Sequence, residues 1–405
     1  MRILHVVPSY YPAVRYGGPI RSVHGLAGAL AGRGHEVHVY TTNVDGPLEA
    51  DVPLGTAVDL DGVSVWYFPT SRGRRLYRST DMRRALDINI SNFDVVHTHS
   101  VFLWPTTAAA RAARAHRVPY VLAPRGMLVA DLIRRKSRLP KLAWMAAFER
   151  HNVEAAAAVH ATSKLEADDI RRLGLRYQRM IVVGNGVEMP DPGASAHCGI
   201  AGISREHLTV LFLGRINWKK GLDRLIPAML HLPEAELVLA GDDDEGYRAP
   251  MEALAGNLGV ATRVRFIGPV HGPEKWSLLA SAQVLVLPSY SENFGNVILE
   301  AMAAGCPVVV TPEVGLAGVV RDSGAGLVIP GDPESLAWAL RSILIDRNAA
   351  RAMGEAGRKT VAERFTWEAI AGEMEQEYLQ ITSDRKRTSD SCGNPHLSLL
   401  KDTRP

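Results

Sequence analysis

Short apolar runs alternate with longer stretches of helical periodicity through the first half of the chain. The runs are rich in Val, Ile and Leu, which is typical of strands buried on both faces of a parallel sheet. They predict strands at 3–7, 36–41, 63–68, 95–97, 120–123, 158–161 and 180–183. Helices are predicted between them, notably at 20–33, 106–116, 141–157 and 164–173. Strands separated by helices predict right-handed crossovers and a parallel sheet covered on both faces.

The same alternation resumes after residues 191–205, which are rich in Pro, Gly and Ala and predict a linker. The second series predicts elements at 209–213, 222–231, 236–240, 247–258, 264–267, 274–280, 282–287, 297–304, 308–311 and 333–345. These elements predict a second doubly wound sheet. The expected organisation is a first domain at 1–190, the linker, a second domain at 206–366, a helix at 367–382 that returns to the first domain, and a disordered tail at 383–405.

Length and composition are consistent with two soluble domains. A chain of 405 residues is too long for one ordinary core. Its hydrophobic content of 46% is typical of a globular protein. No apolar run reaches the length of about 18 residues that a membrane-spanning helix needs. The three cysteines are far apart and suggest neither a disulfide framework nor a metal cluster, which favours a cytoplasmic location.

The net charge of +3 conceals opposite charges in the two halves. Residues 1–190 carry 25 Lys and Arg against 16 Asp and Glu, a net charge of +9, whereas 191–382 carry 16 against 24, a net charge of −8. The basic half has neither interleaved aromatic residues nor a nucleic-acid motif. An anionic membrane surface or a phosphorylated acceptor is therefore favoured over nucleic acid as its partner.

Two arginine-rich stretches concentrate this positive charge. The second stretch precedes a predicted amphipathic helix with Trp144 and Phe148, which suits peripheral docking on the inner face of the cell membrane. A solvated face beside a core helix explains the same pattern equally well. The cations are Arg72, Arg74, Arg75, Arg78, Arg83 and Arg84 in the first stretch, and Arg134, Arg135, Lys136, Arg138 and Lys141 in the second.

The segment 289–305 carries the clearest chemistry. The apolar run 282–287 is broken by Pro288 and a polar loop, and the residues from about 296 onward favour a helix. The N-terminus of such a helix favours an anion such as phosphate. Glu292 and Glu300 flank this end, and a phosphate would repel them, so they more plausibly accept hydrogen bonds from sugar hydroxyls. A ligand with phosphate between two hydroxyl-rich rings is a nucleotide sugar.

This segment, SENFGNVILEAMAAG, resembles the two-glutamate motif of retaining glycosyltransferases of family 4, the group 1 enzymes of surface-polysaccharide assembly. Seven residues separate Glu292 from Glu300, and a Gly-x-Pro-Val-Val run follows at 305–309. The resemblance covers roughly residues 1–380. It implies an α/β protein of the GT-B class, with two Rossmann-like doubly wound parallel-sheet domains facing across a cleft. One departure is the stretch 312–316, where many members carry a Gly-Gly pair.

By this resemblance, Glu300 binds the ribose and Glu292 the transferred sugar. Arg215 and Lys220, five residues apart after a predicted strand, stabilise the negative charge of the departing diphosphate without a metal. The expected catalytic residues are Glu292, His99, Arg215 and Lys220. The expected donor-binding residues are Gly17, Gly18, Arg215, Lys220, Gly268, Glu292, Asn293, Phe294, Gly295, Asn296, Val297 and Glu300.

Three further candidates lie in the first half and also depend on the resemblance. Gly17-Gly18 precedes a helix and is similar to the glycine loop of the family, although it lacks the G-x-G-x-x-G spacing of a dinucleotide site. His99 matches the family histidine that reaches the transferred sugar better than His97 does, and both rings have the alternative of simple packing. Arg125 is a candidate on the acceptor side.

The run Asp242-Asp243-Asp244 admits a metal interpretation, because carboxylates in a D-x-D arrangement bind Mg²⁺ or Mn²⁺ in other nucleotide-sugar enzymes. The run also resembles the Gly-x-Asp loop of the family, and Arg215 and Lys220 already supply positive charge. We therefore expect neither a metal nor another cofactor.

The predicted function is a retaining, metal-independent hexosyltransferase. It moves a sugar from a UDP- or GDP-sugar to a saccharide or to a lipid-pyrophosphate-linked saccharide in polysaccharide biosynthesis. Two alternatives remain at this point. A nucleotide-sugar epimerase shares the architecture but needs no acceptor, and a non-catalytic sugar-nucleotide-binding protein would bind the donor without transferring it.

Overall fold

The computed structural model describes residues 1–13, 17–70, 73–130, 133, 138–190 and 208–392. Residue contacts divide the chain into two units. The first comprises Met1–Ala161, Ile170–Val183 and the chain from Ala371, and the second comprises Thr162–Asp169 and Gly184–Ile370. The expected linker at 191–205 lies outside the described residues.

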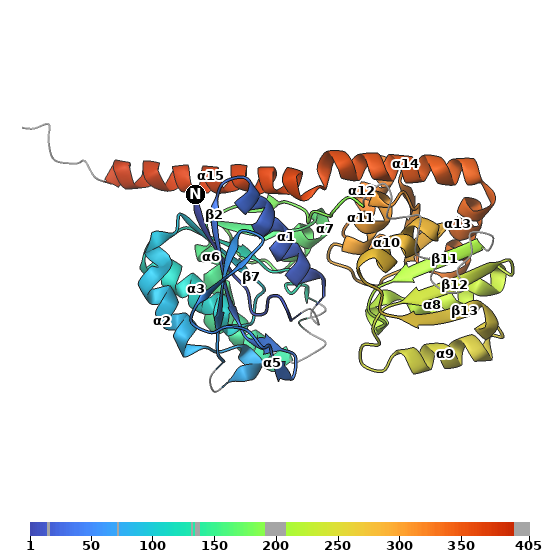
Figure 1. Cartoon of the computed structure of the whole chain (residues 1–405), viewed down its shortest axis with the longest axis horizontal. Helices are drawn as coiled ribbons and strands as arrows, with labels where there is room; N and C mark the ends of the chain where they lie inside the picture. The colour runs from blue at the N-terminus through green and yellow to red at the C-terminus, as the bar shows by residue number, and fades with distance from the viewer. Residues whose placement is uncertain (14–16, 71–72, 131–132, 134–137, 191–207, 393–405) are drawn as a thin grey trace, which may run out of the picture. The chain divides into compact units, whose positions relative to one another are not determined.

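The first unit is built on an eight-stranded sheet with the order β10-β9-β8-β7-β1-β2-β6-β5 (Figure 1). Neighbouring strands are parallel except for β5, which pairs antiparallel with β6 at the edge. The sequence did not predict β5, because its exposed edge lacks a buried apolar run. The strands are β1 Arg2–Val6, β2 Glu36–Thr42, β5 Ala57–Leu60, β6 Val63–Phe68, β7 Val95–His99, β8 Tyr120–Ala123, β9 Ala158–Ala161 and β10 Met180–Val182, with a small ribbon of β3 Val44–Asp45 and β4 Leu48–Glu49.

Helices cover this sheet through apolar faces of helical spacing. In α1, Ile20, Val23, Leu26 and Leu30 are buried, and a Pro in the first turn favours initiation there. The expected helix at 141–157 is interrupted by a π-helical turn at Met145–Glu149. The helices are α1 Gly18–Gly32, α2 Thr80–Asn89, α3 Trp104–Ala115, α5 Arg138–Trp144 and α6 Arg150–Ala155, with 3₁₀ turns η2 Arg74–Leu76 and η3 Ile90–Asn92. Helix α7 (Lys164–Arg172) begins in the second unit and ends in the first.

The second unit is built on a six-stranded parallel sheet with the order β13-β12-β11-β14-β15-β16 (Figure 1). Strand β11 lies between β12 and β14, so the order reverses beside it, and ligands bind beyond the carboxyl ends of strands at such a point. The strands are β11 Leu208–Leu213, β12 Ala235–Ala240, β13 Val264–Gly268, β14 Val284–Leu287, β15 Val308–Val310 and β16 Gly326–Val328.

Two groups of helices complete this unit, with α8 packed against α9 and α13, and α11 packed against α10 and α14. The helices are α8 Leu222–Ala228, α9 Arg248–Asn257, α10 Gly272–Ser281, α11 Asn296–Ala303, α12 Ala317–Ser323, α13 Pro333–Ile345 and α14 Arg347–Arg364, with 3₁₀ turns η6 Trp218–Lys220, η7 Met229–His231 and η8 Ala261–Arg263. No helix in the described part of the chain combines the length and the apolarity needed to cross a membrane.

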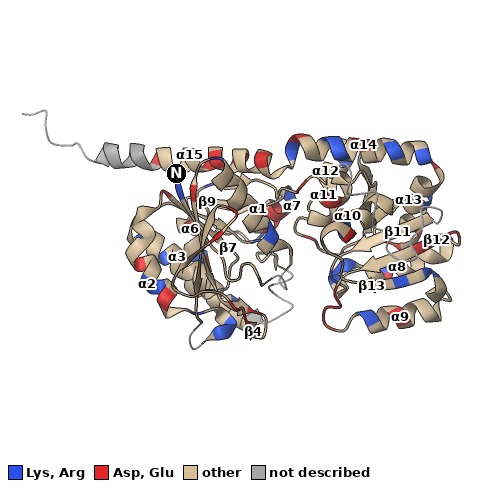
Figure 2. Ribbon diagram, in the orientation of Figure 1, with Lys and Arg blue, Asp and Glu red and all other residues tan. Residues whose placement is uncertain are grey.

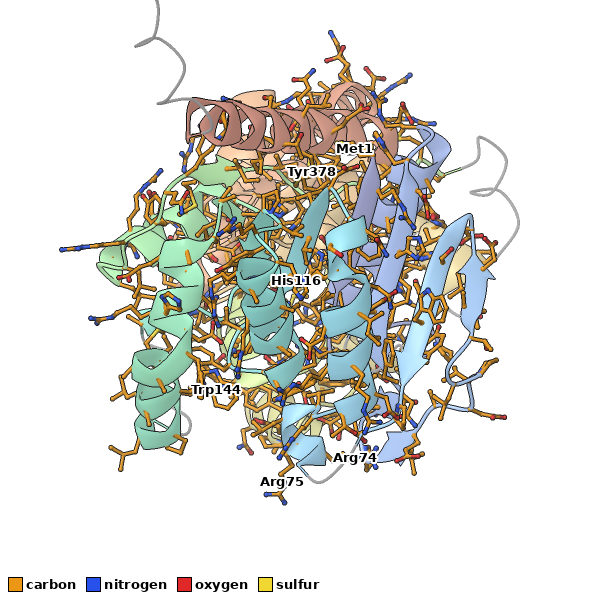
Figure 3. The ribbon with its side chains drawn as sticks, turned by 90° about the vertical axis from the view of Figure 1, so that its left-hand side faces the viewer. Met1, Arg74, Arg75, His116, Trp144 and Tyr378 are labelled. Atoms are coloured by element: carbon orange, nitrogen blue, oxygen red, sulfur yellow. The ribbon has the colours of Figure 1, made fainter. Side chains whose placement is uncertain are left out.

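The last helix, α15 (Trp367–Cys392), belongs to the first unit from Ala371 onward. Tyr378 is fully buried against the sheet, and its hydroxyl donates to His97 Nδ1 at 2.6 Å (Figure 3). Glu375 pairs with Arg33 at 2.6 Å and with His35 at 2.9 Å. These buried and charged contacts fix the helix to the β1–β7 region of the unit.

The structure corrects two expected boundaries. Residues 383–392 are helical rather than disordered, since no Gly or Pro interrupts α15 before Gly393; the rest of the expected tail lies beyond the described chain. Residues 162–169 and 184–190 group with the second unit rather than the first. The reason for 162–169 is polar: Ser163 Oγ donates to the carbonyl of Asn293 at 2.9 Å.

Candidate functional site

The loops after the central strands of the second unit hold most of the expected donor-binding residues. Backbone hydrogen bonds tie these loops together. Gly214 N donates to Ala240 O at 2.9 Å, Gly241 N to Gly268 O at 2.8 Å, and Ile216 N to Asp242 O at 2.8 Å. The loops that carry Arg215, the acidic run and Gly268 therefore meet at one edge of the sheet.

Two glycines allow this close approach. A Cβ on Gly241 (φ +148°) would lie 1.9 Å from the carbonyl oxygen of Gly214. A Cβ on Gly221 (φ +69°) would lie 2.1 Å from the carbonyl oxygen of Pro288. Any side chain at these positions would push the loops apart. The second contact places Lys220 beside the end of β14, where the Glu292 loop begins.

The N-terminus of α11 begins at Asn296 after Gly295, which has a left-handed conformation with φ +94°. Gly295 supplies no side-chain cap, so the first turn of this helix retains the partial positive charge that attracts an anion. Asn185 Nδ2 donates to Asn296 Oδ1 at 2.9 Å and orients that side chain.

The loop at 312–316, where the sequence departs from the family pattern, supports the Glu292 loop through its backbone. Glu292 N donates to Glu313 O at 3.0 Å, and Gly315 N donates to Glu292 O at 2.9 Å. A Cβ on Gly315 would lie 2.1 Å from the carbonyl oxygen of Asn293. One glycine at 315 therefore provides the close contact that the two loops need.

Each of the two motif glutamates is paired with a lysine. Lys220 Nζ donates to Glu292 Oε2, with side chains 16% and 21% exposed. Lys275 Nζ donates to Glu300 Oε1 at 2.8 Å, with side chains 12% and 17% exposed. These pairs are mostly shielded from water, which strengthens the attraction between their charges. The second unit therefore holds two neutralised ion pairs around the start of α11.

Ion pairs elsewhere in the second unit differ from these two. Arg248–Glu252 on α9 and Arg351–Glu355 on α14 are four residues apart on one helix and exposed, and Figure 2 shows such opposite charges along both helices. Exposed pairs of this kind contribute at most about 1 kcal/mol. They mark solvated faces rather than a site.

The acidic run after β12 is engaged with neighbouring groups. Asp244 Oδ2 accepts from Arg215 NH1 at 3.2 Å and from Asn217 Nδ2 at 3.4 Å. Asp243 Oδ1 accepts from the backbone N–H of Arg248 at 3.0 Å, at the start of α9. The structure therefore places Arg215 against Asp244, with a guanidinium side chain that is 55% exposed.

Two expected donor-binding residues direct their side chains into the protein. Phe294 is 4% exposed, and a Cβ on Gly184 would lie 3.3 Å from its ring. Asn293 Nδ2 donates to Thr162 Oγ1 at 2.8 Å and to Glu166 Oε2 at 3.2 Å. These side chains fix the position of the Glu292 loop, and only their backbone remains for a ligand.

The expected residues of the first unit lie around a buried histidine cluster. His5 on β1, His97 and His99 on β7, and His160 on β9 are each at most 2% exposed. His5 is in register with His97 on the neighbouring strand. Arg125, after β8, donates from Nε to His99 Nδ1 at 3.3 Å. The structure thus brings His99 and Arg125 together.

The hydrogen bonds assign the tautomers of all four rings. Val183 O is an acceptor 2.8 Å from His160 Nε2, so His160 donates there and accepts at Nδ1 from His97 Nε2, 3.2 Å away. Arg125 is a donor, so His99 accepts at Nδ1 and donates from Nε2 to His5 Nδ1 at 2.9 Å. His5 then carries its proton on Nε2, which has no hydrogen-bond partner within the described residues.

Burial keeps the four rings neutral. It lowers the pKa of His5 and of His160 to about 3, with Arg125 adding to the effect in both cases. Burial also lowers the pKa of His97 and of His99 well below the usual value, with neighbouring histidines and Arg125 contributing. At neutral pH the cluster is therefore an uncharged hydrogen-bonded network.

The same rings form a group that could hold a metal ion. Ring nitrogens of His5, His97 and His99 lie within 4.8 Å of one another, and neutral imidazole is a common metal ligand. The charge of Arg125, which contacts His99, opposes a cation there. The hydrogen bonds of His97 and His99 would also have to be replaced.

Backbone strain gathers next to His99. Ser100 (φ +78°), Phe102 (φ +61°) and Arg125 (φ +55°) occupy the left-handed region, which is unfavourable for residues other than glycine and often marks functional sites. The carboxylate of Glu149 holds this loop, because its Oε1 accepts from Phe102 N at 2.9 Å and from Trp144 Nε1 at 3.0 Å. Burial raises the pKa of Glu149.

The Gly17-Gly18 pair begins α1. Gly17 has φ +70° and precedes the helix, and Ser22 Oγ donates to Gly18 O at 2.8 Å. A Cβ on Gly17 would meet no atom within 4 Å, so the glycine is required by its backbone conformation rather than by space.

Sequence reasoning missed Lys275, His5, His160, Glu149 and Tyr378. A signal existed for two of them, because both lie in buried runs predicted as strands: His5 is on β1, next to the strand that carries His97-Thr98-His99, and His160 is on β9, two strands from it. Lys275 gave no comparable signal, because its partner Glu300 lies 25 residues away on another helix.

Two family profiles match the chain. The family described as Glycosyl transferases group 1 matches residues 199–360, and the one described as Glycosyl transferase 4-like domain matches residues 17–186. The first match includes both Lys–Glu pairs, and the second includes the histidine cluster apart from His5.

Relatives and solved structures agree with these matches. An uncharacterized glycosyltransferase of Methanocaldococcus jannaschii is 30% identical, over 93% of this chain and 98% of its own. A D-inositol 3-phosphate glycosyltransferase of Xylanimonas cellulosilytica is 32% identical, over 95% of this chain and 97% of its own. The structure of Anabaena HepE with UDP and glucose has a TM-score of 0.72 at 20% identity, covering 93% of this chain and 99% of that chain, and thus shares the fold.

Proposed function

The chain belongs to the group 1 glycosyltransferases and has the two-domain GT-B fold, and we propose that it transfers a hexose with retention of configuration. The donor is a UDP- or GDP-sugar, and the acceptor is a saccharide or a lipid-linked saccharide. The observation that carries this proposal is the pair of lysine-bound glutamates around the N-terminus of α11.

The donor roles follow from charge. A diphosphate suits the N-terminus of α11 and the cations Lys220 and Arg215, whereas the carboxylates of Glu292 and Glu300 suit the hydroxyls of the sugar and the ribose. HepE, whose structure contains UDP and glucose, supports a donor of this class. Gly268 lies at the end of β13, where the backbone would receive the nucleobase.

Donor binding exchanges the partner of Lys220. In the structure this lysine is paired with Glu292. An arriving diphosphate carries more negative charge than one carboxylate, so it takes over Lys220 and leaves Glu292 to accept from the hydroxyls of the transferred sugar. The same residue thus pairs with Glu292 and, when the donor is bound, stabilises the leaving group.

The transfer step breaks the bond between the anomeric carbon and the phosphate oxygen. A bond from the same carbon to the acceptor oxygen forms on the same face, and the acceptor proton passes to the departing phosphate. Lys220, Arg215 and the N-terminus of α11 stabilise the negative charge that develops there. This chemistry requires no metal, and we propose that the enzyme works without one.

The acceptor side is assigned to the first unit. Arg125, held beside His99, provides a positive charge for a phosphorylated acceptor. The similarity to a D-inositol 3-phosphate glycosyltransferase supports a phosphate-bearing acceptor. A lipid-pyrophosphate-linked saccharide meets the same requirement and fits a role in polysaccharide assembly.

A peripheral membrane role, on the inner face of the cell membrane, belongs to the same proposal. Leu139, Leu142 and Phe148 on and after α5 are 77%, 45% and 44% exposed. Arg74, Arg75 and Trp144 lie toward the same end of the first unit (Figure 3). Apolar side chains with cations nearby suit an anionic leaflet. The cations Arg72, Arg134, Arg135 and Lys136 lie outside the described residues.

Vesicle flotation tests the membrane role. Wild type should float with vesicles containing anionic lipid, and Leu139→Asp with Leu142→Asp should remain in solution. Ile345→Asp, which changes an exposed apolar residue of the second unit, is the matched control. Equal flotation of all three proteins would contradict docking through α5.

A transfer assay tests the function as a whole. The protein is incubated with UDP- and GDP-sugars and with inositol phosphate or a polyprenyl-pyrophosphate saccharide, with and without EDTA. We expect a product whose anomeric proton coupling matches that of the donor, formed equally well in EDTA. An inverted product would contradict retention, and a strict metal requirement would contradict metal independence. Conversion of the donor without an acceptor would indicate an epimerase.

A further inference from the structure

Lys275 lies in the first turn of α10, immediately beyond the loop that follows Gly268. Its side chain crosses to the neighbouring helix α11, where Nζ donates to Glu300 Oε1 at 2.8 Å. The ammonium also lies 4.9 Å from the ring centroid of Trp276. The two helices thus hold one carboxylate of the donor motif between them.

This contact leaves half of the carboxylate available. Oε1 of Glu300 is occupied by Lys275, and Oε2 has no hydrogen-bond partner within the described residues. At 17% exposure, the Glu300 side chain has little room to choose another orientation while the pair is intact. The lysine therefore fixes which oxygen Glu300 presents and in which direction.

With the donor placed as in the proposed function, the two lysine–glutamate pairs would face different parts of the nucleotide sugar. Lys220 precedes Gly221 at the end of the β11 loop, where the diphosphate competes for it. Lys275 follows the Gly268 loop, which would receive the nucleobase and the ribose. Both of these groups are uncharged. Nothing in the ligand competes with Glu300 for Lys275, so this second pair persists when the donor binds.

We propose that Lys275 is the positioning residue for ribose recognition. It orients Glu300 so that Oε2 accepts hydrogen bonds from the ribose hydroxyls, and preference for a ribonucleotide depends on it. This inference rests on the proposed function, in which Glu300 binds the ribose. It adds a residue outside the two-glutamate motif to the recognition of the donor.

Calorimetric titration with matched ligands tests the proposal. The probes are UDP and GDP and their 2′,3′-dideoxy analogues, which lack the hydroxyls that Glu300 would bind. The proteins are wild type, Lys275→Met, Lys275→Arg and Glu274→Gln. Glu274 is an exposed neighbour in the same helical turn and serves as the matched control. Thermal unfolding of each variant checks that it is folded.

Wild type should bind the preferred ribonucleotide roughly tenfold or more tightly than its dideoxy analogue, as expected for hydrogen bonds to a charged acceptor. Lys275→Met should weaken the binding of the ribonucleotide but not that of the dideoxy analogue. The ratio of the two affinities should therefore fall close to one. Lys275→Arg should restore most of the ratio, because it keeps a cation beside Glu300, and Glu274→Gln should match wild type.

Two results would overturn the positioning role. An equal loss of affinity for both ligands in Lys275→Met would show a general structural effect. An unchanged ratio of the two affinities would show that Glu300 acts without Lys275. A ratio near one in wild type would instead remove the ribose role of Glu300, and with it the proposed function. The two failures are thus distinguished by the protein in which they occur.

Discussion

The two units hold their polar groups in opposite ways. The second unit has two partly exposed ion pairs, Lys220–Glu292 and Lys275–Glu300, around a helix N-terminus. The first unit has four fully buried histidines in a neutral network closed by Arg125 and Tyr378. Charged groups near water can exchange partners with a charged ligand, whereas a buried neutral network fixes geometry. In the proposed function, the ion pairs of the second unit therefore bind the donor, and the buried histidines of the first unit fix the position of Arg125.

The largest effect is expected from Glu292→Ala. It should lower the turnover number by about a thousandfold or more, because a contact to the transferred sugar acts in the transition state. Affinity for the free nucleoside diphosphate should stay within a few fold, because the proposed partner of Glu292 is the transferred sugar, which this ligand lacks. Steady-state kinetics and calorimetry measure the two quantities.

Glu313→Gln is the control for this change, because Glu313 is an exposed carboxylate in the neighbouring loop that contributes only its backbone carbonyl. Unchanged turnover in Glu292→Ala would remove Glu292 from the mechanism.

A smaller effect is expected from Lys220→Met. It should lower the affinity for UDP or GDP by roughly ten- to a hundredfold, because a charge-assisted contact to the diphosphate is lost. Affinity for the corresponding nucleoside, which has no phosphate, should remain the same. Lys219→Met, one residue earlier, is the control. Equal losses for nucleotide and nucleoside would contradict the partner exchange and indicate a change in the loop.

The buried histidines predict that the stability of the protein depends on pH. The effect expected from each histidine is smaller than the effects of the two substitutions above. Burial lowers the pKa of His5 to about 3, below the value near 6.5 of the unfolded chain, so the unfolded state binds more protons between these values. The contribution of His5 is therefore fully present above pH 6.5 and is lost as the pH falls toward 3, by about 1.4 kcal/mol per pH unit.

Urea unfolding at pH 7, 6 and 5 measures this slope. His5→Phe should reduce the slope of the free energy of unfolding between pH 6 and 5 by about 1.4 kcal/mol per pH unit. The reason is that it removes one titrating ring from the buried group formed with His97, His99, His160 and Arg125. His151→Gln, which changes an exposed histidine, should leave it unchanged. A slope as steep in His5→Phe as in wild type would show that His5 is charged in the folded protein.

Much of the fold followed from local pattern. The strands predicted at 63–68 and 120–123 coincide with β6 and β8, and the helix predicted at 333–345 coincides with α13. The GT-B fold class is confirmed. These elements repeat one buried pattern and depend little on distant residues. The grouping of 162–169 with the second unit depends on contacts with Asn293, more than a hundred residues away, and no local pattern reports such contacts.

The candidate site shows the same limit of prediction from local sequence patterns. The motif at 292–300 marked the two glutamates as candidates, because their spacing and neighbours are local. It did not identify Lys275, whose contact with Glu300 depends on the packing of α10 against α11. Nor did it show that Phe294 and Asn293 direct their side chains into the protein. Residue types mark the chemistry of a segment, and tertiary packing decides which groups meet a ligand.

Thermal unfolding tests the central claim, that the second unit binds a nucleotide sugar through Glu300. Wild type and Glu300→Ala are heated with UDP, GDP, ADP and their common sugar conjugates. A ligand at a hundred times its Kd adds about 2.7 kcal/mol, which raises Tm by several degrees in domains of this size. Nucleotides of one base should raise the Tm of wild type, and Glu300→Ala should lose this effect. The absence of any shift in wild type at millimolar nucleotide would contradict the claim.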